Sequence, residues 1–402
     1  MDLGRFKAEF AARRTGHTLP AALYRETSAF DFDMNAVFGR SWLMAGFACE
    51  LPKNGSYVAL MVGKWPVLIA RGRDGIIRAF HNSCRHRGSI LCQVGSGSAP
   101  KLVCPYHRWT YDLDGSLFNA NRMAEDFDKS EHGLKPIAIE IVVGAMFICL
   151  GDAPPPFAEF AAKLDHYAAP HDWGNAKVAH QSTLVEFANW KLVMENAREC
   201  YHCATGHPEL ARTFPVEMSK HFDVGSDAAA QRFLAEMAAC GLATDAVEGH
   251  WWQLARFALS EDCVSITMDG KHASKRLMCD ANGGSMGSMR LAIDPHCFVH
   301  ATADHTFMFS AMPVSATETH VMGTWLVHKD AVEGVDYDVA TLIDLWTRTN
   351  LQDKELAENN QLGVNSPGYT PGPYSPDAEM LARRFTDWYC DTSRAYIAAH
   401  VD

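Results

Sequence analysis

Cys84-Arg85-His86 and Cys104-Pro105-Tyr106-His107 are two short motifs, and each supplies one thiol and one imidazole. This pairing suits an asymmetric two-iron centre, in which two cysteines bind one iron, two histidines bind the other, and inorganic sulfides bridge them. Because neutral imidazoles replace two thiolates, such a cluster has a higher reduction potential than an all-cysteine cluster. The motifs therefore predict a one-electron acceptor whose ligands are Cys84, His86, Cys104 and His107.

A structural zinc is the main alternative, because a Cys2His2 set also satisfies tetrahedral Zn²⁺. Common zinc motifs pair Cys with Cys and His with His, whereas both halves of this set are mixed. The flanking sequences are His86-Arg87-Gly88 on one side, and Trp109 with Asp112-Leu113-Asp114-Gly115 on the other. With these flanks the region resembles the Rieske domain of the ring-hydroxylating oxygenase family. The resemblance favours the iron–sulfur cluster over zinc.

Bulk composition limits the classes of protein that the chain can belong to. At 402 residues, with 48% hydrophobic and 21% charged residues, we expect a soluble protein of two domains. A formal net charge of −12 argues against nucleic acid or an anionic membrane as a partner. The sequence has no apolar run of membrane-spanning length, no signal-peptide core near Met1, and 12 scattered cysteines that do not suggest a disulfide framework. We therefore expect a cytoplasmic protein.

Composition also changes near residue 155. Apolar and β-branched runs separated by glycine predict strands at 55–64, 65–70, 75–80 and 142–150, and the proline-rich segment 152–157 follows them. We expect an N-terminal helical segment at 1–40 that packs on the catalytic domain, a [2Fe–2S] domain at 41–155 and a catalytic domain at 156–402.

In the second half, patterning predicts a strand at 177–187, a helix at about 189–203, and strands at 298–299, 306–313 and 320–328. A long helix is expected at about 339–363. The final helix should start near Pro376, with Ser375 as its N-cap and Asp377 in its first turn.

A second candidate metal site centres on two histidines. Glu199 and His202 are three residues apart, so a helix would place them on one face. Gly206 and Pro208 flank His207, so the helix should break there and let His207 turn toward His202. Two histidines alone are a weak signal, because an ordinary core or surface pair is the commoner explanation.

A carboxylate to complete this site is best sought in the long helix. Its 3.6-residue periodicity places one carboxylate, that of Asp353, on a stripe with Leu342, Trp346, Thr349, Leu356 and Asn360. An unpaired buried carboxylate is costly, and a metal ion would remove that cost. A helix cap or salt bridge is the alternative, and periodicity alone favours it.

A family resemblance changes this balance. Asn189-Trp190-Lys191, Glu195-Asn196, Gln361-Leu362-Gly363 and the segment 369–375 resemble the catalytic domain of Rieske non-haem iron oxygenases. The resemblance implies that His202, His207 and Asp353 are a 2-His-1-carboxylate triad for Fe(II), with open positions for O2. It also implies a catalytic pair, Asn196 and Glu199.

In this resemblance, Glu199 is the acid that hydrogen-bonds His107 of the partner subunit and passes electrons between the centres. Many members of the family carry Asp at this position, and the additional methylene of Glu changes the reach of the carboxylate.

The resemblance further implies an α+β fold with an N-terminal Rieske [2Fe–2S] antiparallel β domain. A C-terminal helix-grip catalytic domain follows, with an antiparallel sheet and long helices. Family members are commonly head-to-tail homotrimers, in which electrons pass between subunits. A separate reductase, with flavin and its own [2Fe–2S] centre, would deliver electrons from NAD(P)H.

The segments 325–338 and 359–366 resemble the branch of this family that contains glycine betaine monooxygenase and stachydrine demethylase, with carnitine oxygenase as a more distant relative. We therefore expect hydroxylation or N-demethylation of a small betaine-like quaternary ammonium compound. Aromatic faces attract such a cation, and core packing is the alternative for each candidate. The candidates are Trp251, Trp252, Phe298, Phe307 and Phe309, with Arg290 for a substrate carboxylate.

Two other functions remain open at this point. The same metal sites would support hydroxylation or O-demethylation of a small aromatic acid. A Rieske electron carrier without catalysis of its own would need the first metal site and not the second.

Overall fold

The structure is a computed structural model that describes residues 2–216 and 227–401. It forms two compact units, Met1–Gly39 with Pro156–Asp402, and Arg40–Pro155. The first is called here the catalytic unit and the second the cluster unit. The chain therefore leaves the catalytic unit after its first helices and returns to it after residue 155.

The cluster unit contains two antiparallel sheets. The larger sheet has the strand order β1-β10-β9-β4-β3-β2-β5, and the smaller has the order β6-β7-β8. The strands are β1 (Leu43–Phe47), β2 (Ser56–Val62), β3 (Trp65–Arg71), β4 (Ile77–His81), β5 (Gly95–Ser98), β6 (Leu102–Val103), β7 (Thr110–Tyr111), β8 (Leu117–Asn119), β9 (Pro136–Val142) and β10 (Ala145–Cys149).

The single strand expected at 142–150 is wrong at its start. Val142 ends β9, and β10 begins at Ala145. Val143 and Gly144 have φ of 44° and 88°, so they form a two-residue turn that reverses the chain. The segment is therefore the second half of a β-hairpin.

The catalytic unit is built on one antiparallel sheet with the order β11-β17-β16-β15-β14-β13-β12. Every pair of neighbouring strands is antiparallel. From β12 to β17 the strands are neighbours in sequence order, and β11 lies at the edge of the sheet beside β17. Its strands are β11 (Ala176–Glu186), β12 (Val247–Glu248), β13 (Trp252–Phe257), β14 (Ser288–Ile293), β15 (Cys297–Ala301), β16 (His305–Ser315) and β17 (Glu318–His328). Together with the helices below, this confirms the predicted fold class.

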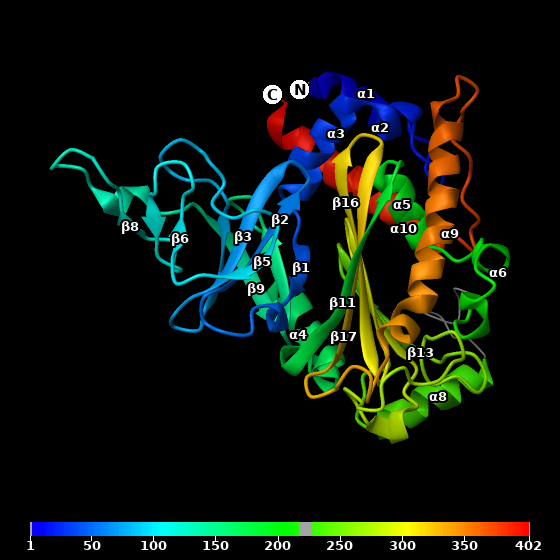
Figure 1. Ribbon diagram of the computed structural model, residues 1–402. Helices are drawn as coiled ribbons and strands as arrows, with labels where there is room; N and C mark the ends of the chain where they lie inside the picture. Colours follow the sequence, from blue (N-terminus) through cyan, green and yellow to red (C-terminus); the bar gives the residue numbers. More distant parts are fainter. Residues whose placement is uncertain (1, 217–226, 402) are drawn as a thin grey trace. The chain divides into compact units, whose positions relative to one another are not determined.

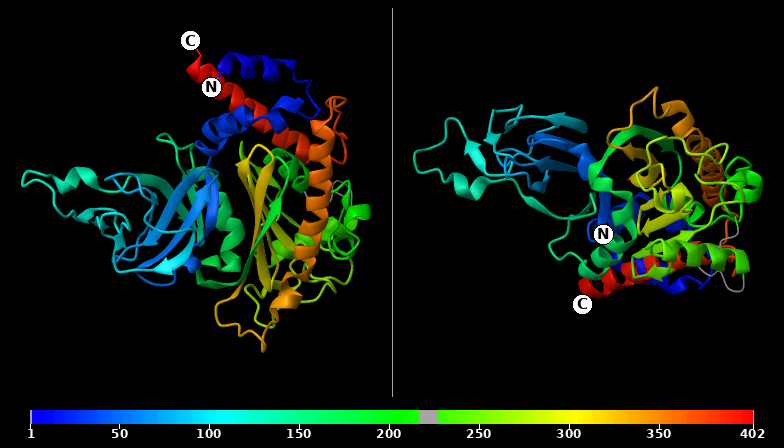
Figure 2. Two further views of the ribbon diagram at one scale, coloured as in Figure 1. Left: turned by 45° about the horizontal axis from the view of Figure 1, so that its top comes forward. Right: turned by 90° about the horizontal axis from the view of Figure 1, so that it is seen from below.

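The helices of the catalytic unit come from both ends of the chain. They are α1 (Leu3–Ala12), α2 (Ala21–Arg25), α3 (Thr27–Asp33), α4 (Ala158–Ala168), α5 (Trp190–Ala197), α6 (Cys203–Gly206), α8 (Ala228–Ala239), α9 (Val339–Asn365) and α10 (Met380–His400). Figure 1 shows α9, in orange, running along one face of the catalytic sheet. Figure 2 shows the N-terminal helices beside α10.

Three sequence expectations about helices need correction. The helix expected at 189–203 ends at Ala197, and the final helix starts at Met380 instead of Pro376. Ser375 Oγ does accept the N–H of Ala378 at 3.2 Å, but that turn does not continue because Glu379 has ψ of 26°. On α9 the expected stripe is buried or half-buried from Leu342 to Asp353, but farther along Asn360 is exposed and Gln361 is buried in its place.

A buried carboxylate ties α3 to α5 and α10. Asp33 Oδ2 forms an ion pair with Lys191 and accepts the indole N–H of Trp190 at 2.9 Å. Its Oδ1 accepts the hydroxyl of Tyr389 at 2.7 Å. Asp33 and Lys191 are both fully buried, so each charge depends on the other for compensation. This network joins the N-terminal helices to the helix that leads into the candidate metal site.

Among the described residues, no helix is both long enough and apolar enough to cross a membrane.

We predict that Lys191→Met lowers the free energy of unfolding of the catalytic unit by about 3–5 kcal/mol, because it leaves the Asp33 charge buried without its partner. Lys329→Met is the matched control, since Lys329 pairs with Asp330 on the surface and should contribute within about 1 kcal/mol. Urea unfolding followed by fluorescence and by circular dichroism would measure both. Equal stabilities for the two variants would show that the buried pair does not hold the unit together.

Candidate metal centres and cavity

The two motif loops of the cluster unit have the same backbone design. In each loop the cysteine N–H donates to the carbonyl five residues later: Cys84 to Ser89 at 2.9 Å and Cys104 to Trp109 at 2.8 Å. The residue at the fourth position donates back to the cysteine carbonyl and has positive φ, 76° for Gly88 and 64° for Arg108. The sequence spacing therefore produces two equivalent loops that present their side chains to a common site.

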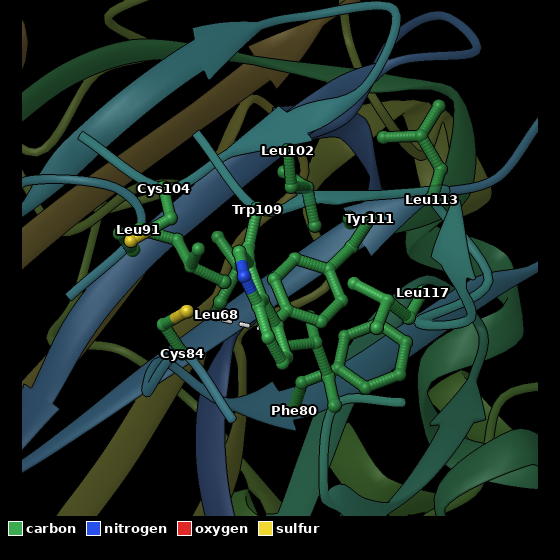
Figure 3. Packing of buried hydrophobic residues seen from close by; sticks show 13 residues of the cluster. Leu68, Phe80, Cys84, Leu91, Leu102, Cys104, Trp109, Tyr111, Leu113 and Leu117 are labelled. Atoms are coloured by element: carbon green, nitrogen blue, oxygen red, sulfur yellow. Dashed lines mark hydrogen bonds between the residues drawn. The ribbon is translucent and has the colours of Figure 1, made fainter. Parts of the chain in front are cut away.

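The four side chains differ in exposure in a way that suits an asymmetric cluster. Cys84 and Cys104 are buried at one edge of the packed core of the cluster unit (Figure 3). His86 and His107 are exposed, and their ring centroids are 4.7 Å apart. His86 also stacks on Trp109 at 4.8 Å. The arrangement fits a [2Fe–2S] group with its cysteine-bound iron inside and its histidine-bound iron at the surface.

Tyr111 supplies a hydrogen bond to this site. Its hydroxyl oxygen accepts the backbone N–H of Arg85 at 3.0 Å and lies 3.2 Å from Cys84 Sγ. Because the oxygen already accepts from Arg85, its own proton is available to a Cys84 thiolate. Hydrogen bonds to cluster sulfurs raise the reduction potential, since they stabilise the more negative reduced state.

The second centre brings together side chains from two distant segments. His202 Nε2 and His207 Nε2 are 3.0 Å apart, and Asp353 Oδ1 lies 3.2 Å from the first and 2.9 Å from the second. Donor atoms at right angles around a metal, with bonds of about 2.1 Å, would be about 3 Å apart. The three atoms therefore form one triangular face of the size that a metal ion requires.

The outer nitrogens of both histidines have oxygen partners. His202 Nδ1 is 2.5 Å from Glu199 Oε1, and His207 Nδ1 is 2.8 Å from Gln352 Oε1. Gln352 in turn donates to Glu209 at 3.1 Å. An Nδ1–H that donates to oxygen leaves Nε2 as the metal-binding nitrogen, which is the usual arrangement at metal sites.

The electrostatics of the triad favour a positive charge. Burial alone lowers the pKa of His202, but the carboxylates of Asp353 and Glu199 outweigh this effect and raise that pKa to about 9. Burial likewise raises the pKa of Asp353, while its hydrogen bonds to His202 and His207 bring that pKa below its usual range. The same negative surroundings suit a bound cation.

The loop that carries His202 differs from the expected helix. Glu199 and His202 both lie after α5, and they contact each other directly instead of sharing a helical face. Gly206 ends α6 and His207 follows it, as the flanking Gly and Pro indicated. Cys200 and Cys203, beside His202, form a disulfide, while the other cysteines of the described chain are free.

Helix α9 is held in place by three side chains that follow Asp353. They bind backbone groups at the end of β11 and in the segment that leads to α5: Lys354 donates to the Val185 carbonyl at 2.7 Å, Glu358 accepts the Phe187 N–H at 2.9 Å, and Gln361 accepts the Asn189 N–H at 2.8 Å. These contacts fix the height and rotation of α9 and thereby the position of Asp353.

A cavity opens on the triad. Its lining includes His202, His207 and Asp353, the predicted catalytic pair Asn196 and Glu199, and the aromatic side chains of Phe214, Phe298, Phe309 and Trp346. The lining also includes the buried charged side chains of Arg198, Arg290 and Glu186. Of these, Arg198 forms an ion pair with Asp294 at 2.9 Å.

Not all of the predicted substrate residues reach this cavity. Phe298, Phe309 and Arg290 line it. Phe307 does not, because Trp346 stacks over it at 4.6 Å. Trp251 and Trp252 lie elsewhere, in contact with Phe160 of α4.

The sequence reasoning did not identify Trp346, Phe214, His300 or Glu186 as cavity residues. Trp346 could have been found, because it precedes Asp353 by two helical turns on the same stripe. His300 lies on β15, Glu186 is at the end of β11 and Phe214 is in a loop, and no local sequence pattern marks any of them.

Comparison with known proteins identifies the two domains. Residues 41–137 match the Rieske [2Fe-2S] domain, and residues 173–394 match the ring hydroxylating alpha subunit (catalytic domain). The glycine betaine monooxygenase oxygenase subunit of Pseudomonas aeruginosa (strain PAO1) is 48% identical over 389 residues, covering 94% of this chain and 90% of that protein. The subunit of the same description from Chromohalobacter salexigens is 43% identical over 402 residues, covering 96% and 88%.

Two solved structures share the fold at low sequence identity. The quaternary ammonium Rieske monooxygenase CntA in complex with substrate L-carnitine has a TM-score of 0.71 and 22% identity, over 96% of this chain and 97% of that chain. Naphthalene 1,2-dioxygenase from Rhodococcus sp., bound to indole, has a TM-score of 0.68 and 18% identity, over 98% and 97%. The chain belongs to the family of Rieske ring-hydroxylating oxygenase alpha subunits, and the resemblance drawn from the motifs is confirmed.

We predict that Asp353→Ala removes the mononuclear iron and leaves the cluster spectrum unchanged, because the carboxylate belongs to the second site only. Asp344→Ala is the control, since Asp344 lies on the same helix and pairs with Arg348 at the surface. Metal analysis with visible absorption would distinguish the two sites. Full iron content in Asp353→Ala would assign that carboxylate a structural role.

We also predict that Tyr111→Phe lowers the reduction potential of the cluster, because the thiolate of Cys84 loses a hydrogen bond. Tyr57→Phe changes a hydroxyl of the same unit that interacts with Cys92 and should leave the potential unchanged. Spectroelectrochemical titration measures both variants. An unaltered potential in Tyr111→Phe would mean that the hydroxyl does not donate to the cluster.

Proposed function

We propose that this chain is the oxygenase component of an enzyme that N-demethylates a small betaine, with glycine betaine as the first candidate. The observation that carries the proposal is the composition of one cavity, in which the triad, aromatic walls and a buried arginine occur together. The two relatives that align over most of the chain and are named for glycine betaine support the same choice. A carnitine monooxygenase subunit from Escherichia coli (strain K12) is 33% identical over about half of this chain.

The aromatic walls suit a cation that cannot donate strong hydrogen bonds. Phe298 and Phe309 are stacked with their ring centroids 4.6 Å apart. Trp346 also lines the cavity, with its ring centroid 6.0 Å from that of Phe298. Each ring face attracts an ammonium group by about 0.5–2 kcal/mol, while offering it no competing hydrogen-bond acceptor.

The carboxylate of a betaine would be met by Arg290. This residue is on β14, buried, and lines the cavity. Burial and the nearby cation of Arg198 lower its pKa to about 9, so it sits in a region of excess positive charge. Arg198 and Arg384 share Asp294 at 2.9 Å each. A substrate anion beside Arg290 would relieve the repulsion among these three cations.

The residues of the two centres have distinct roles in this proposal. Cys84, His86, Cys104 and His107 hold the [2Fe–2S] cluster, and His202, His207 and Asp353 hold Fe(II). When bound, the iron activates O2 for insertion of one oxygen atom into an N-methyl C–H bond. Glu199 and Gln352 orient the two histidines through their Nδ1 atoms, and the apolar walls exclude water from the reacting carbon.

The hydroxylated methyl group then leaves without a further oxidant. Its O–H proton departs, the C–N bond breaks with its electron pair remaining on nitrogen, and the products are formaldehyde and a tertiary amine. The reaction uses one O2, two electrons and two protons for each hydroxylation, and the second oxygen atom leaves as water.

We further propose that the electrons come from NAD(P)H through a separate flavin and [2Fe–2S] reductase, in a cytoplasmic homotrimer. His107 is exposed, as a residue that meets another chain must be. Glu199 contacts His202 directly, so it can connect His107 of the partner subunit to the mononuclear centre.

The test of the function is a reconstituted reaction with a surrogate reductase. We expect formaldehyde and dimethylglycine from glycine betaine, in equal amounts and matched to the O2 consumed. Proline betaine, carnitine, benzoate and a methoxybenzoate complete the panel. Turnover of an aromatic acid with none of any betaine would replace the proposed substrate class.

For the bridge, we predict that Glu199→Ala keeps both metals and slows oxidation of the reduced cluster after O2 is added. Glu209→Ala, at a carboxylate of the same loop region that binds Gln352, should leave that rate closer to the wild-type value. Stopped-flow absorption at the cluster band measures the rate. Fast cluster oxidation in Glu199→Ala would exclude the bridging role.

A further inference from the structure

Glu186 is a buried carboxylate that the roles described above do not use. It is the last residue of β11, only 1% of its surface is exposed, and it lines the same cavity as the triad. Its Oε2 atom is buried, and within residues 2–216 and 227–401 it has no hydrogen-bond partner. A desolvated carboxylate oxygen without a partner is costly, so its presence in a cavity wall requires an explanation.

The neighbouring charges do not provide that explanation. Burial, together with the carboxylates of Asp353 and Glu358, raises the pKa of Glu186 to about 8. Lys354 is the cation that opposes this effect, but its ammonium group donates to the Val185 carbonyl at 2.7 Å and pairs with Glu358 at 3.3 Å. With that pKa the carboxyl group is mostly protonated near neutral pH, and a cation placed beside it would lower its pKa and leave it ionised. The nearest cation of the protein is committed to other partners.

A cationic substrate would be repelled by the metal at this end of the cavity. Fe(II) bound by Asp353 and two neutral histidines has a net positive charge, and an N-methyl carbon can react only if its ammonium group comes close to that metal. Aromatic faces attract the cation but do not cancel the charge of the metal. A second carboxylate near Asp353 would do so.

We propose that Glu186 is a specificity residue that selects substrates with a quaternary ammonium group and directs that group to the iron end of the cavity. The inference rests on the proposed function and deepens it. Glu186 is on β11 and Arg290 is on β14, with β17, β16 and β15 between them in the sheet. The cavity therefore has a negative end at β11 and α9 and a positive end at β14, which orients a zwitterion along the line between them.

A pair of isosteric ligands separates charge from shape. Glycine betaine and 3,3-dimethylbutanoate have the same outline and the same carboxylate, but the second has carbon in place of the ammonium nitrogen. Their dissociation constants would be measured by calorimetry in iron-loaded protein under anaerobic conditions and again in protein without the mononuclear iron. We expect the wild type to bind glycine betaine more tightly in both forms.

In Glu186→Gln, which keeps the shape and removes the charge, we expect the ratio of the two affinities to fall by about tenfold. Binding of 3,3-dimethylbutanoate and the iron content should stay unchanged. Glu355→Gln is the matched control, because it removes an exposed carboxylate of the same helix, α9, that does not line the cavity. Its affinity ratio should remain that of the wild type.

Each other outcome overturns the inference in a recognisable way. An unchanged ratio in Glu186→Gln, in protein that demethylates glycine betaine, refutes the role of Glu186 and leaves the proposed function intact. Loss of iron in that variant would make Glu186 a support for Asp353 instead. If the variant does not fold, the wild type alone decides, since equal affinities for the two ligands would rule out selection by charge. Absence of betaine turnover in the wild type would refute the proposed function itself.

Discussion

The position of Asp353 is the constraint on which the catalytic unit depends. Its carboxylate must stay within 3.2 Å of two imidazole nitrogens that belong to a loop about 150 residues earlier, and all three donors must keep an open side toward the cavity. The scaffold must therefore hold α9 and the histidine loop in register. Lys354, Glu358 and Gln361 meet this requirement by binding the backbone of residues 185–189, which leads directly into α5 and the histidine loop. One segment thus fixes both halves of the triad.

Much of the fold could be predicted because its signals are local. The strands β11, β16 and β17 and the helix α9 have strong periodicity, and their observed bounds lie within a few residues of the expected ones. The cysteine and histidine motifs are informative for the same reason: each occupies one short loop, so its spacing alone limits its geometry. Gly206 and Pro208 predict that the chain turns at His207 toward His202, and the structure places the Nε2 atoms of the two histidines 3.0 Å apart.

The remaining features depend on tertiary contacts, which a single sequence does not reveal. Phe307 and Phe309 look equivalent on one strand, yet Trp346 covers only the first of them. Trp251 has the composition of a cation-binding residue, but α4 packs against it. Glu186 at the end of a strand would ordinarily be a surface residue, and α9 makes it a buried one. The early end of α5 has a similar cause, since Arg198 leaves the helix to pair with Asp294, 96 residues away.

The interrupted course of the catalytic unit affects how the chain can be made. Helix α1 packs on α10, where Phe10 contacts Tyr389 and Arg13 pairs with Asp387, 374 residues later. At ribosomal rates of about 5–20 residues per second, roughly 20–75 s pass between the synthesis of these two segments. The cluster unit is continuous in sequence and can fold during that interval. Phe32 of α3 can cover Phe6 soon after α1 is made. The side of Phe10 that meets Tyr389 stays uncovered until α10 is complete, so during this interval the nascent chain carries an exposed aromatic group of the kind that chaperones bind.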